Sequence, residues 1–221
     1  MNKINVITID GPSASGKGSL AREIAKTYEL SILDSGSLYR LYAYFAKEGM
    51  KSELISNAIQ KNIEFKISNQ DLVIINVDID ITDKLRSESI ASLASELSSK
   101  EEVRSALFDI QRSFYNDKGL VADGRDMGTV VFPNAGTKIF LIADPEVRAK
   151  RRFLELQKAG QEVNMRDLIE DIRLRDESDR VREISPLIPA EDSIEVNSSN
   201  LSIKEVLEIV IKIYKENIKE V

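Results

Sequence analysis

The run from Gly11 to Gly18, G-P-S-A-S-G-K-G, is the feature that most constrains the fold of this chain. It fits G-x-x-x-x-G-K, the pattern of a loop whose backbone N–H groups hold phosphate oxygens. Before it, residues 4 to 9 are apolar and rich in β-branched side chains, which predicts a buried strand; after it, residues 17 to 28 show helical spacing of apolar side chains. We therefore expect a phosphate-binding loop between a strand and a helix of an α/β protein.

The residue types in the loop explain how it would hold an anion. Gly11 and Gly16 permit backbone conformations that a β-carbon resists, so consecutive N–H groups can point at phosphate oxygens. The start of the helix adds its partial positive charge, and Lys17 supplies a cation for the β- and γ-phosphates of a nucleotide. The residues expected to bind the nucleotide are Gly11, Pro12, Ser13, Ala14, Ser15, Gly16, Lys17, Gly18 and Ser19.

The position after the lysine departs from the usual pattern. Gly18 stands where a serine or threonine hydroxyl ordinarily binds Mg²⁺, and Ser19 follows one place later. We therefore expect the nucleotide phosphates and water to hold Mg²⁺, with no certain protein ligand and Ser19 as a weak candidate.

Composition narrows the chemistry that the chain can perform. Its 221 residues are 42% hydrophobic and 31% charged, which is typical of one ordinary globular unit. Cysteine and histidine are both absent, so disulfides, thiolate zinc sites and Ser-His or Cys-His catalysis are excluded. The net charge of -6 argues against non-specific binding of nucleic acid.

Arginine is concentrated in one part of the chain. Residues 125 to 182 hold nine of the 14 arginines but only three of the 17 lysines. Because the planar guanidinium group matches phosphate oxygens bidentately, this stretch indicates phosphate binding. Solvated helix faces with i,i+4 ion pairs are an equally good explanation of this feature alone.

Hydrophobic patterning predicts an open parallel sheet with one antiparallel insertion. The parallel strands are expected at residues 4 to 9, 31 to 33, 119 to 122, 138 to 143 and 193 to 196, and the antiparallel strands at 62 to 67, 72 to 75 and 77 to 81. Helices are expected at 17 to 28, from Gly36 to about Lys47, and at 87 to 97, 101 to 114, 146 to 159, 164 to 178 and 202 to 214. Since the chain shows neither a secretion leader nor an apolar run of about 20 residues, we expect a cytoplasmic protein without membrane contact.

Several segments resemble the bacterial cytidylate kinases in order and in sequence. They are Gly11–Ser19, Asp34–Arg40 (D-S-G-S-L-Y-R), Asp123–Pro133 (D-G-R-D-M-G-T-V-V-F-P), Arg175–Arg182 (R-D-E-S-D-R-V-R) and Ser185–Leu187 (S-P-L). The resemblance spans residues 4 to about 200 and implies transfer of the ATP γ-phosphoryl group to CMP or dCMP, with Mg²⁺ as cofactor.

The resemblance also implies a fold. This is a P-loop nucleoside-monophosphate-kinase-like fold, with a five-stranded parallel sheet flanked by helices, a small antiparallel insertion and a short helical lid. A single kinase unit, expected to be a monomer, would cover residues 1–221. Its core would comprise 1–35, 85–145 and 180–221, its acceptor-nucleotide region 36–84 and its Arg-rich lid 146–179.

The same resemblance implies roles for individual residues on the acceptor side. Arg40 and Arg125 would hold the acceptor phosphate, and Ser95 and Arg104 would read cytosine. Arg175 and Asp179 would hold the ribose, with Arg182 nearby. The alternative for Arg175 and Asp179 is an ordinary i,i+4 salt bridge without a role in binding. The expected acceptor-binding residues are Ser35, Tyr39, Arg40, Ser95, Arg104, Arg125, Asp126, Arg175, Asp179 and Arg182.

The catalytic set implied by the resemblance is Lys17, Arg125, Asp126, Arg151 and Arg152. Asp126 has three open roles: ordering Arg125, contacting the substrate or orienting metal-bound water. Arg148, Arg151 and Arg152 share a helical face and could reach the transferring phosphoryl group when the lid closes, and a solvated surface position is an equally good interpretation of any one of them. The alternatives are another small P-loop kinase, of the adenylate or shikimate kinase type, and a nucleotide-binding module without turnover.

Overall fold

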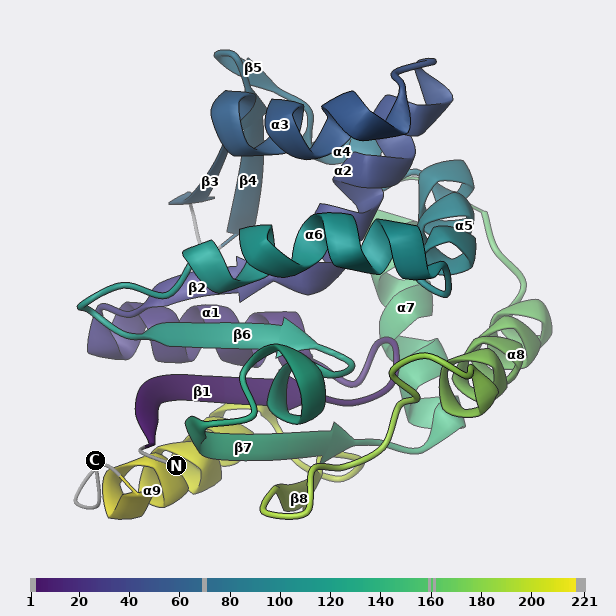
Figure 1. Ribbon diagram of the computed structural model, residues 1–221. Coiled ribbons are helices and arrows are strands. Elements are labelled where there is room, and N and C mark those ends of the chain that lie inside the picture. The colour runs from purple at the N-terminus through teal and green to yellow at the C-terminus, as the bar shows by residue number, and fades with distance from the viewer. Residues whose placement is uncertain (1–2, 69–70, 159, 161, 218–221) are drawn as a thin grey trace.

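The computed structural model describes residues 3–68, 71–158, 160 and 162–217, and its centre is a five-stranded parallel sheet (Figure 1). The strand order is β2-β6-β1-β7-β8, which confirms the expected parallel core. The bounds are β1 Ile4–Asp10, β2 Ser31–Asp34, β6 Leu120–Gly124, β7 Ala135–Ile142 and β8 Ile194–Asn197.

Alternation along the buried strands divides the core into two layers. Ile7 and Ile9 of β1 pack with α1 (Lys17–Tyr28) and α9 (Ile203–Asn217) on one face. Val6 belongs to the cluster on the other face, which is covered by α2, α5 and α6. These three helices span Ser35–Lys47, Glu88–Leu97 and Glu101–Ser113. The sheet is thus buried on both faces, and its strand ends are left to form a site.

The antiparallel insertion forms above the parallel sheet, as expected (Figure 1). Its strands are β3 Ile63–Ser68, β4 Asp71–Asn76 and β5 Ile79–Asp80, and the residues 69 and 70 expected to turn between the first two lie outside the described part. The prediction that β5 begins at Val77 is wrong. Val77 and Asp78 have φ angles of 45° and 67°, so they form a left-handed turn before the strand.

Three short elements were not predicted. Helix α3 (Ser52–Asn62) has apolar residues at helical spacing, with Ile55 and Ile59 buried, so its signal was present and was overlooked. Helix α4 (Thr82–Leu85) is a single turn, which is too short to show a hydrophobic period. The π-helix η1 (Met127–Val131) follows β6. Such helices are often found at functional sites.

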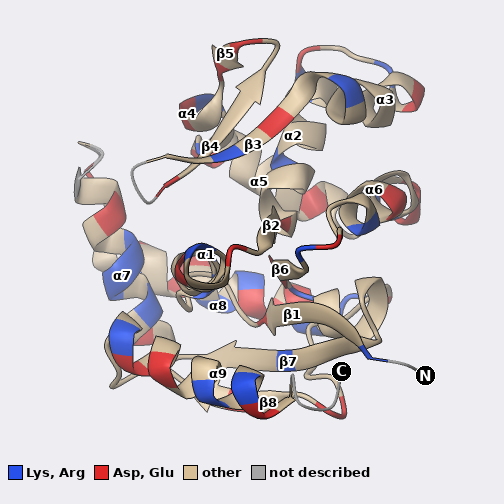
Figure 2. Ribbon diagram, turned by 90° about the vertical axis from the view of Figure 1, so that its left-hand side faces the viewer, with Lys and Arg blue, Asp and Glu red and all other residues tan. Residues whose placement is uncertain are grey.

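Two helices carry the Arg-rich stretch, as expected. They are α7 (Pro145–Lys158) and α8 (Met165–Val181), with Gly160 between them at a φ of 73°. The expected end of the first helix at residue 159 lies outside the described part. Figure 2 shows the basic residues spread along α7. Within the described residues, no helix combines the length and apolarity needed to cross a membrane.

Candidate active site

The predicted phosphate loop connects β1 to α1 with backbone angles that favour glycine. Gly11 has a φ of 149°, and a β-carbon there would collide with the carbonyl oxygen of Leu141 on β7. Gly16 has a φ of 100° and caps the start of α1. These positions explain why the loop needs glycine at both ends of its turn.

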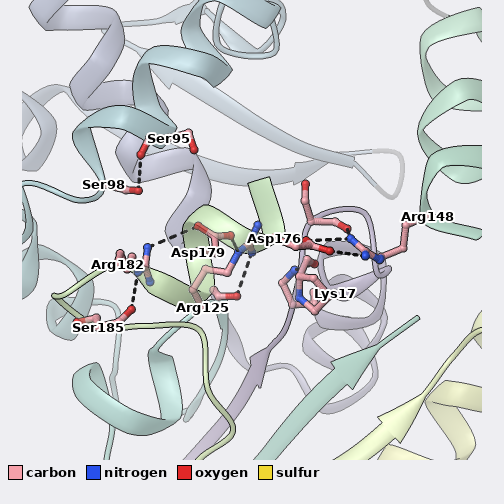
Figure 3. A network of polar contacts seen from close by, with 12 residues as sticks. Lys17, Ser95, Ser98, Arg125, Arg148, Asp176, Asp179, Arg182 and Ser185 are labelled. Atoms are coloured by element: carbon pink, nitrogen blue, oxygen red, sulfur yellow. Dashed lines mark hydrogen bonds and ion pairs between the residues drawn. The ribbon is translucent and has the colours of Figure 1, made fainter. Parts of the chain in front are cut away.

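Lys17 folds back over this loop. Its Nζ donates a 2.8 Å hydrogen bond to the carbonyl oxygen of Pro12, and its side chain is buried (Figure 3). Burial and the positive charge of Arg125 lower the pKa of Lys17, whereas Asp123 and Asp10 raise it. An anion beside the loop would therefore favour the charged ammonium group.

The three α7 arginines lie at i, i+3 and i+4 of one helix, as expected, but each has different partners. Arg148 is 2% exposed and binds both carboxylate oxygens of Asp176 on α8, at 3.0 and 2.5 Å (Figure 3). Arg151 donates a 2.9 Å hydrogen bond to the carbonyl of Ser15 in the phosphate loop. Arg152 points elsewhere, to Glu88 and Glu155 at 3.4 Å. Arg148 is therefore an anchor between α7 and α8, and only Arg152 has a partly free position.

A second cluster of cations lies at the end of β6. Arg125 Nε donates a 2.8 Å hydrogen bond to Asp179 on α8, and Arg182 lies 3.7 Å from the other oxygen of that carboxylate. Arg182 also donates to the carbonyl of Ser185 at 2.5 Å (Figure 3). Asp179 thus joins two guanidinium groups that are far apart in sequence.

The i,i+4 salt bridge between Arg175 and Asp179 does not form, because Arg125 and Arg182 occupy the Asp179 carboxylate. Among the described residues, Nε of Arg175 is buried without a hydrogen-bond partner, and so is Nη2 of Arg182. Burial and the nearby charge of Arg125 lower the pKa of Arg175 to about 10. Arg40 donates no hydrogen bond to a described residue, and burial lowers its pKa as well.

The residues expected to read the base form a chain of contacts near Arg182. Arg104 is ion-paired with Asp126 and donates a 3.1 Å hydrogen bond to the carbonyl of Ser98, whose hydroxyl donates to the carbonyl of Ser95. The guanidinium of Arg104 also lies 5.8 Å from the ring of Tyr39. The first of the three roles considered for Asp126, the ordering of Arg125, is wrong. The Asp126 carboxylate pairs with Arg104, whereas Arg125 pairs with Asp179.

Two further residues on the acceptor side are buried. Ser35 accepts a 3.0 Å hydrogen bond from Gln111 of α6. Burial raises the pKa of Tyr39 to about 12, so its hydroxyl stays protonated at neutral pH. Both residues stand on α2, which begins where the Asp34 side chain accepts from the Ser37 amide at 3.0 Å.

The sequence reasoning missed two buried carboxylates, Asp10 and Asp123, at the ends of β1 and β6. Asp123 is 8% exposed and accepts no hydrogen bond from a described residue. A β-carbon on Gly18 would lie 3.3 Å from its Oδ2, and burial together with Asp34 raises its pKa. A carboxylate closing each of two predicted strands was the available signal, since ligands in such sheets bind beyond the carboxyl ends of strands.

The expected metal candidate Ser19 is turned away from the loop. Its side chain is exposed, and its hydroxyl accepts a 3.3 Å hydrogen bond from Arg22. Within the described residues, no group of three or more Asp, Glu, His or Cys side chains is placed to hold a metal ion.

A phosphate loop on a parallel sheet, faced by buried guanidinium groups from three separate segments, places the chain among the P-loop kinases. The family model for cytidylate kinase matches residues 7–216. The chain belongs to the cytidylate kinase family, and this membership does not favour an adenylate or shikimate kinase or a module without turnover.

Individual relatives agree with this placement. The cytidylate kinase of Acinetobacter baylyi is 42% identical over 98% of this chain and 99% of its own length. The cytidylate kinase of Pseudomonas fluorescens is 46% identical over 93% of each chain. A crystal structure of an uncharacterized protein from Eubacterium ventriosum has a TM-score of 0.52 at 12% identity, covering 96% of this chain and 98% of that one, and shows the fold alone.

Proposed function

We propose that this site performs the reaction of its family by holding two anionic nucleotides against each other. The reaction transfers the γ-phosphoryl group of ATP to CMP or dCMP and gives ADP with CDP or dCDP. The phosphate loop from Gly11 to Ser19 binds ATP, and the cluster around Arg125 binds the acceptor.

The main task of the protein is to cancel repulsion between the substrates. At a separation of roughly 4 Å and an effective dielectric near 20, two unit charges repel by about 4 kcal/mol. Phosphoryl transfer has a loose transition state, so fixed cations and alignment provide most of the catalysis. Lys17 supplies charge on the donor side, and Arg40, Arg125 and Arg175 supply it on the acceptor side. Arg151 and Arg152 of the lid stay candidates for the transferring group.

The unpartnered nitrogens of Arg175 and Arg182 are the observation that carries this proposal. Buried N–H groups almost always have an acceptor, and leaving one without it costs about 1 to 3 kcal/mol. These two nitrogens lie beside Arg125 and Asp179. Phosphate and ribose oxygens of a bound nucleotide would satisfy them once the side chains that cover these nitrogens move to admit it.

The base and the sugar would be read by different residues. Cytosine presents an amino donor and two acceptors, which complement the Asp126 carboxylate and the Arg104 guanidinium, with Ser95 beside them. We propose that Asp179 and Arg182 bind the ribose, with Ser35 and Tyr39, four residues apart on α2, beside it.

The residues beside Gly18 fit a magnesium ion that is bound mainly by ATP. Asp123 accepts no hydrogen bond from a described residue, and its ionised carboxylate would suit a metal-bound water. When bound, Mg²⁺ neutralises phosphate charge. Asp123, rather than Ser19, would orient the ion from the protein side.

The direct test is a coupled ADP-release assay with CMP, dCMP, UMP, AMP and shikimate as acceptors. We expect turnover with CMP and dCMP to exceed turnover with AMP and shikimate by a large factor. Equal or greater turnover with AMP would overturn the assignment of the acceptor. We further propose a cytoplasmic monomer, which sedimentation tests. The -6 net charge supports the absence of nucleic-acid partners.

A further inference from the structure

Asp10 is a buried carboxylate that no step of the reaction uses directly. It is the last residue of β1 and immediately precedes Gly11 of the phosphate loop. Its side chain is 5% exposed, yet neither oxygen accepts a hydrogen bond from that loop. Instead, its two oxygens accept hydrogen bonds from the backbone N–H groups of Met127 and Gly128, at 2.8 and 2.7 Å.

These two amides begin the segment that carries the acceptor-side residues. Met127 and Gly128 are the first residues of η1, whereas Arg125 and Asp126 are the two residues before them. The carbonyl of Asp126 accepts from the amides of Val130 and Val131 at 2.9 and 3.2 Å, so the π-helix turns directly above the anchored peptides. A shift of the anchored amides would therefore move Arg125 and Asp126 with them.

The backbone approaches β1 closely at this point. A β-carbon on Gly128 would lie 2.8 Å from Thr8 Oγ1 and 3.2 Å from Lys138 Cδ. Thr8 Oγ1 itself is buried without a hydrogen-bond partner among the described residues, so it packs against the segment without holding it. Of the two polar side chains that β1 directs at η1, only Asp10 makes hydrogen bonds to it.

A charged group in this place is unfavourable for folding. Burial, with the charge of Asp126, raises the pKa of Asp10 to about 6, although both backbone hydrogen bonds and Lys17 lower it. Removal of a carboxylate from water without a full counter-charge has a cost. We therefore explain the presence of a carboxylate here by the position in which its two oxygens hold the backbone of Met127 and Gly128.

We propose that Asp10 is a positioning residue for the acceptor nucleotide: its two oxygens fix the start of η1 and thereby the places of Arg125 and Asp126. The proposal rests on the acceptor role given to Arg125 above. It also means that one residue links the start of the donor loop to the acceptor-binding segment.

Asp10→Asn is the first variant to test, because it keeps the shape of the side chain and replaces one acceptor with a donor. Thr8→Val is the matched control, since Thr8 lies on the same strand against the same segment but makes no hydrogen bond to it. For each variant, kcat and the KM values for CMP and ATP are measured, with hydrogen exchange of peptides covering residues 125 to 132. Thermal unfolding reports whether each variant folds.

For Asp10→Asn we expect the KM for CMP to rise about fivefold or more, because a misplaced ligand group weakens binding far more than its local contact suggests. The KM for ATP should change less than about twofold, and exchange at 125 to 132 should become faster. Thr8→Val should leave both KM values unchanged. An unchanged KM for CMP in folded Asp10→Asn would overturn the proposal.

Two further variants make every outcome informative. If Asp10→Asn does not fold, Gly128→Ala displaces the same segment while Asp10 is retained, because the new methyl group would press on Thr8 and on the Asp10 carboxylate. A raised KM for CMP in folded Gly128→Ala supports the proposal, and an unchanged one overturns it. Arg125→Met separates the two hypotheses: if it leaves the KM for CMP unchanged, the acceptor role of Arg125 fails, whereas the exchange result still reports on the Asp10 anchor.

Discussion

Arg125 and Asp179 are 54 residues apart in the sequence, and the Nε of the first donates a 2.8 Å hydrogen bond to the carboxylate of the second. The pair joins the end of β6 to α8. Because Arg182 approaches the other oxygen of the same carboxylate, Asp179 holds two cations in place. Asp179 can therefore affect the acceptor through Arg125 as well as by direct contact.

Asp179→Ala should lower kcat/KM for CMP and UMP by the same factor, about tenfold to a hundredfold, because both share the ribose and the phosphate. If Arg125 holds the phosphate of every acceptor, as proposed, dCMP should also lose much of its kcat/KM. Steady-state kinetics with the three acceptors measures this, and Asp192→Ala, which removes a largely exposed carboxylate paired with Lys138, is the control. If dCMP is unaffected, Asp179 acts only on the 2′-hydroxyl and its pairing with Arg125 has no role.

Lys17→Ala should reduce kcat by about a hundredfold or more, because the ammonium group meets the charge of the transferring phosphates. The fold should persist, since Lys17 makes its hydrogen bond to the Pro12 carbonyl and belongs to neither hydrophobic cluster. Single-turnover rates and thermal unfolding, measured together, check both statements. Near-normal turnover in the folded variant would disprove the role of the loop.

Arg104→Met should lower kcat/KM for CMP by roughly tenfold to a hundredfold and narrow the preference for CMP over UMP. The reason is the ion pair with Asp126, which would present one acceptor and one donor to the edge of cytosine. The KM for ATP is the internal control and should not change. An unaltered CMP:UMP ratio would mean that Arg104 is structural.

The raised pKa of Asp10 predicts how its effect on stability varies with pH. The folded state binds the proton up to about pH 6, whereas the unfolded chain releases it near the ordinary value of 3.8. The unfolded state therefore binds fewer protons between these values, and the contribution of Asp10 to the free energy of unfolding falls as pH rises.

Asn does not titrate, so the stability of Asp10→Asn relative to the natural protein should increase from pH 4 to pH 7, by on the order of 2 to 3 kcal/mol. Urea unfolding of both proteins across this range measures the difference. A difference that stays constant with pH would show that Asp10 is not shifted in the folded state.

Most of the fold could be predicted because its signals are local. The apolar runs of β1 and β7, the glycines of the phosphate loop and the period of α9 each specify an element by themselves. Helix α3 was missed although its apolar residues have helical spacing, whereas α4 and η1 are too short to show a period and depend on their neighbours. The π-helix, for example, follows from anchoring of its first amides by Asp10, which lies 117 residues away from Met127.

The family resemblance predicted which residues form the site, whereas residue spacing did not predict which of them pair. The resemblance identified the arginines of the site. In the structure, two carboxylates, Asp126 and Asp179, lie near four of them: Arg104, Arg125, Arg175 and Arg182. Their pairing was not predictable, because spacing along one helix favoured an ion pair between Arg175 and Asp179. A partner from β6 occupies that carboxylate instead, and no pattern within α8 indicates it.

Arg148 and Arg151 fix the direction in which two peptide groups of the phosphate loop face. In a planar trans peptide, the carbonyl and the following N–H point to opposite sides. Arg148 binds the carbonyl of Ser13 at 3.1 Å and Arg151 that of Ser15 at 2.9 Å, which turns the amides of Ala14 and Gly16 away from these two cations. Neither peptide plane can flip without breaking a charge-assisted hydrogen bond, so an arriving phosphate meets donors whose orientation is already set.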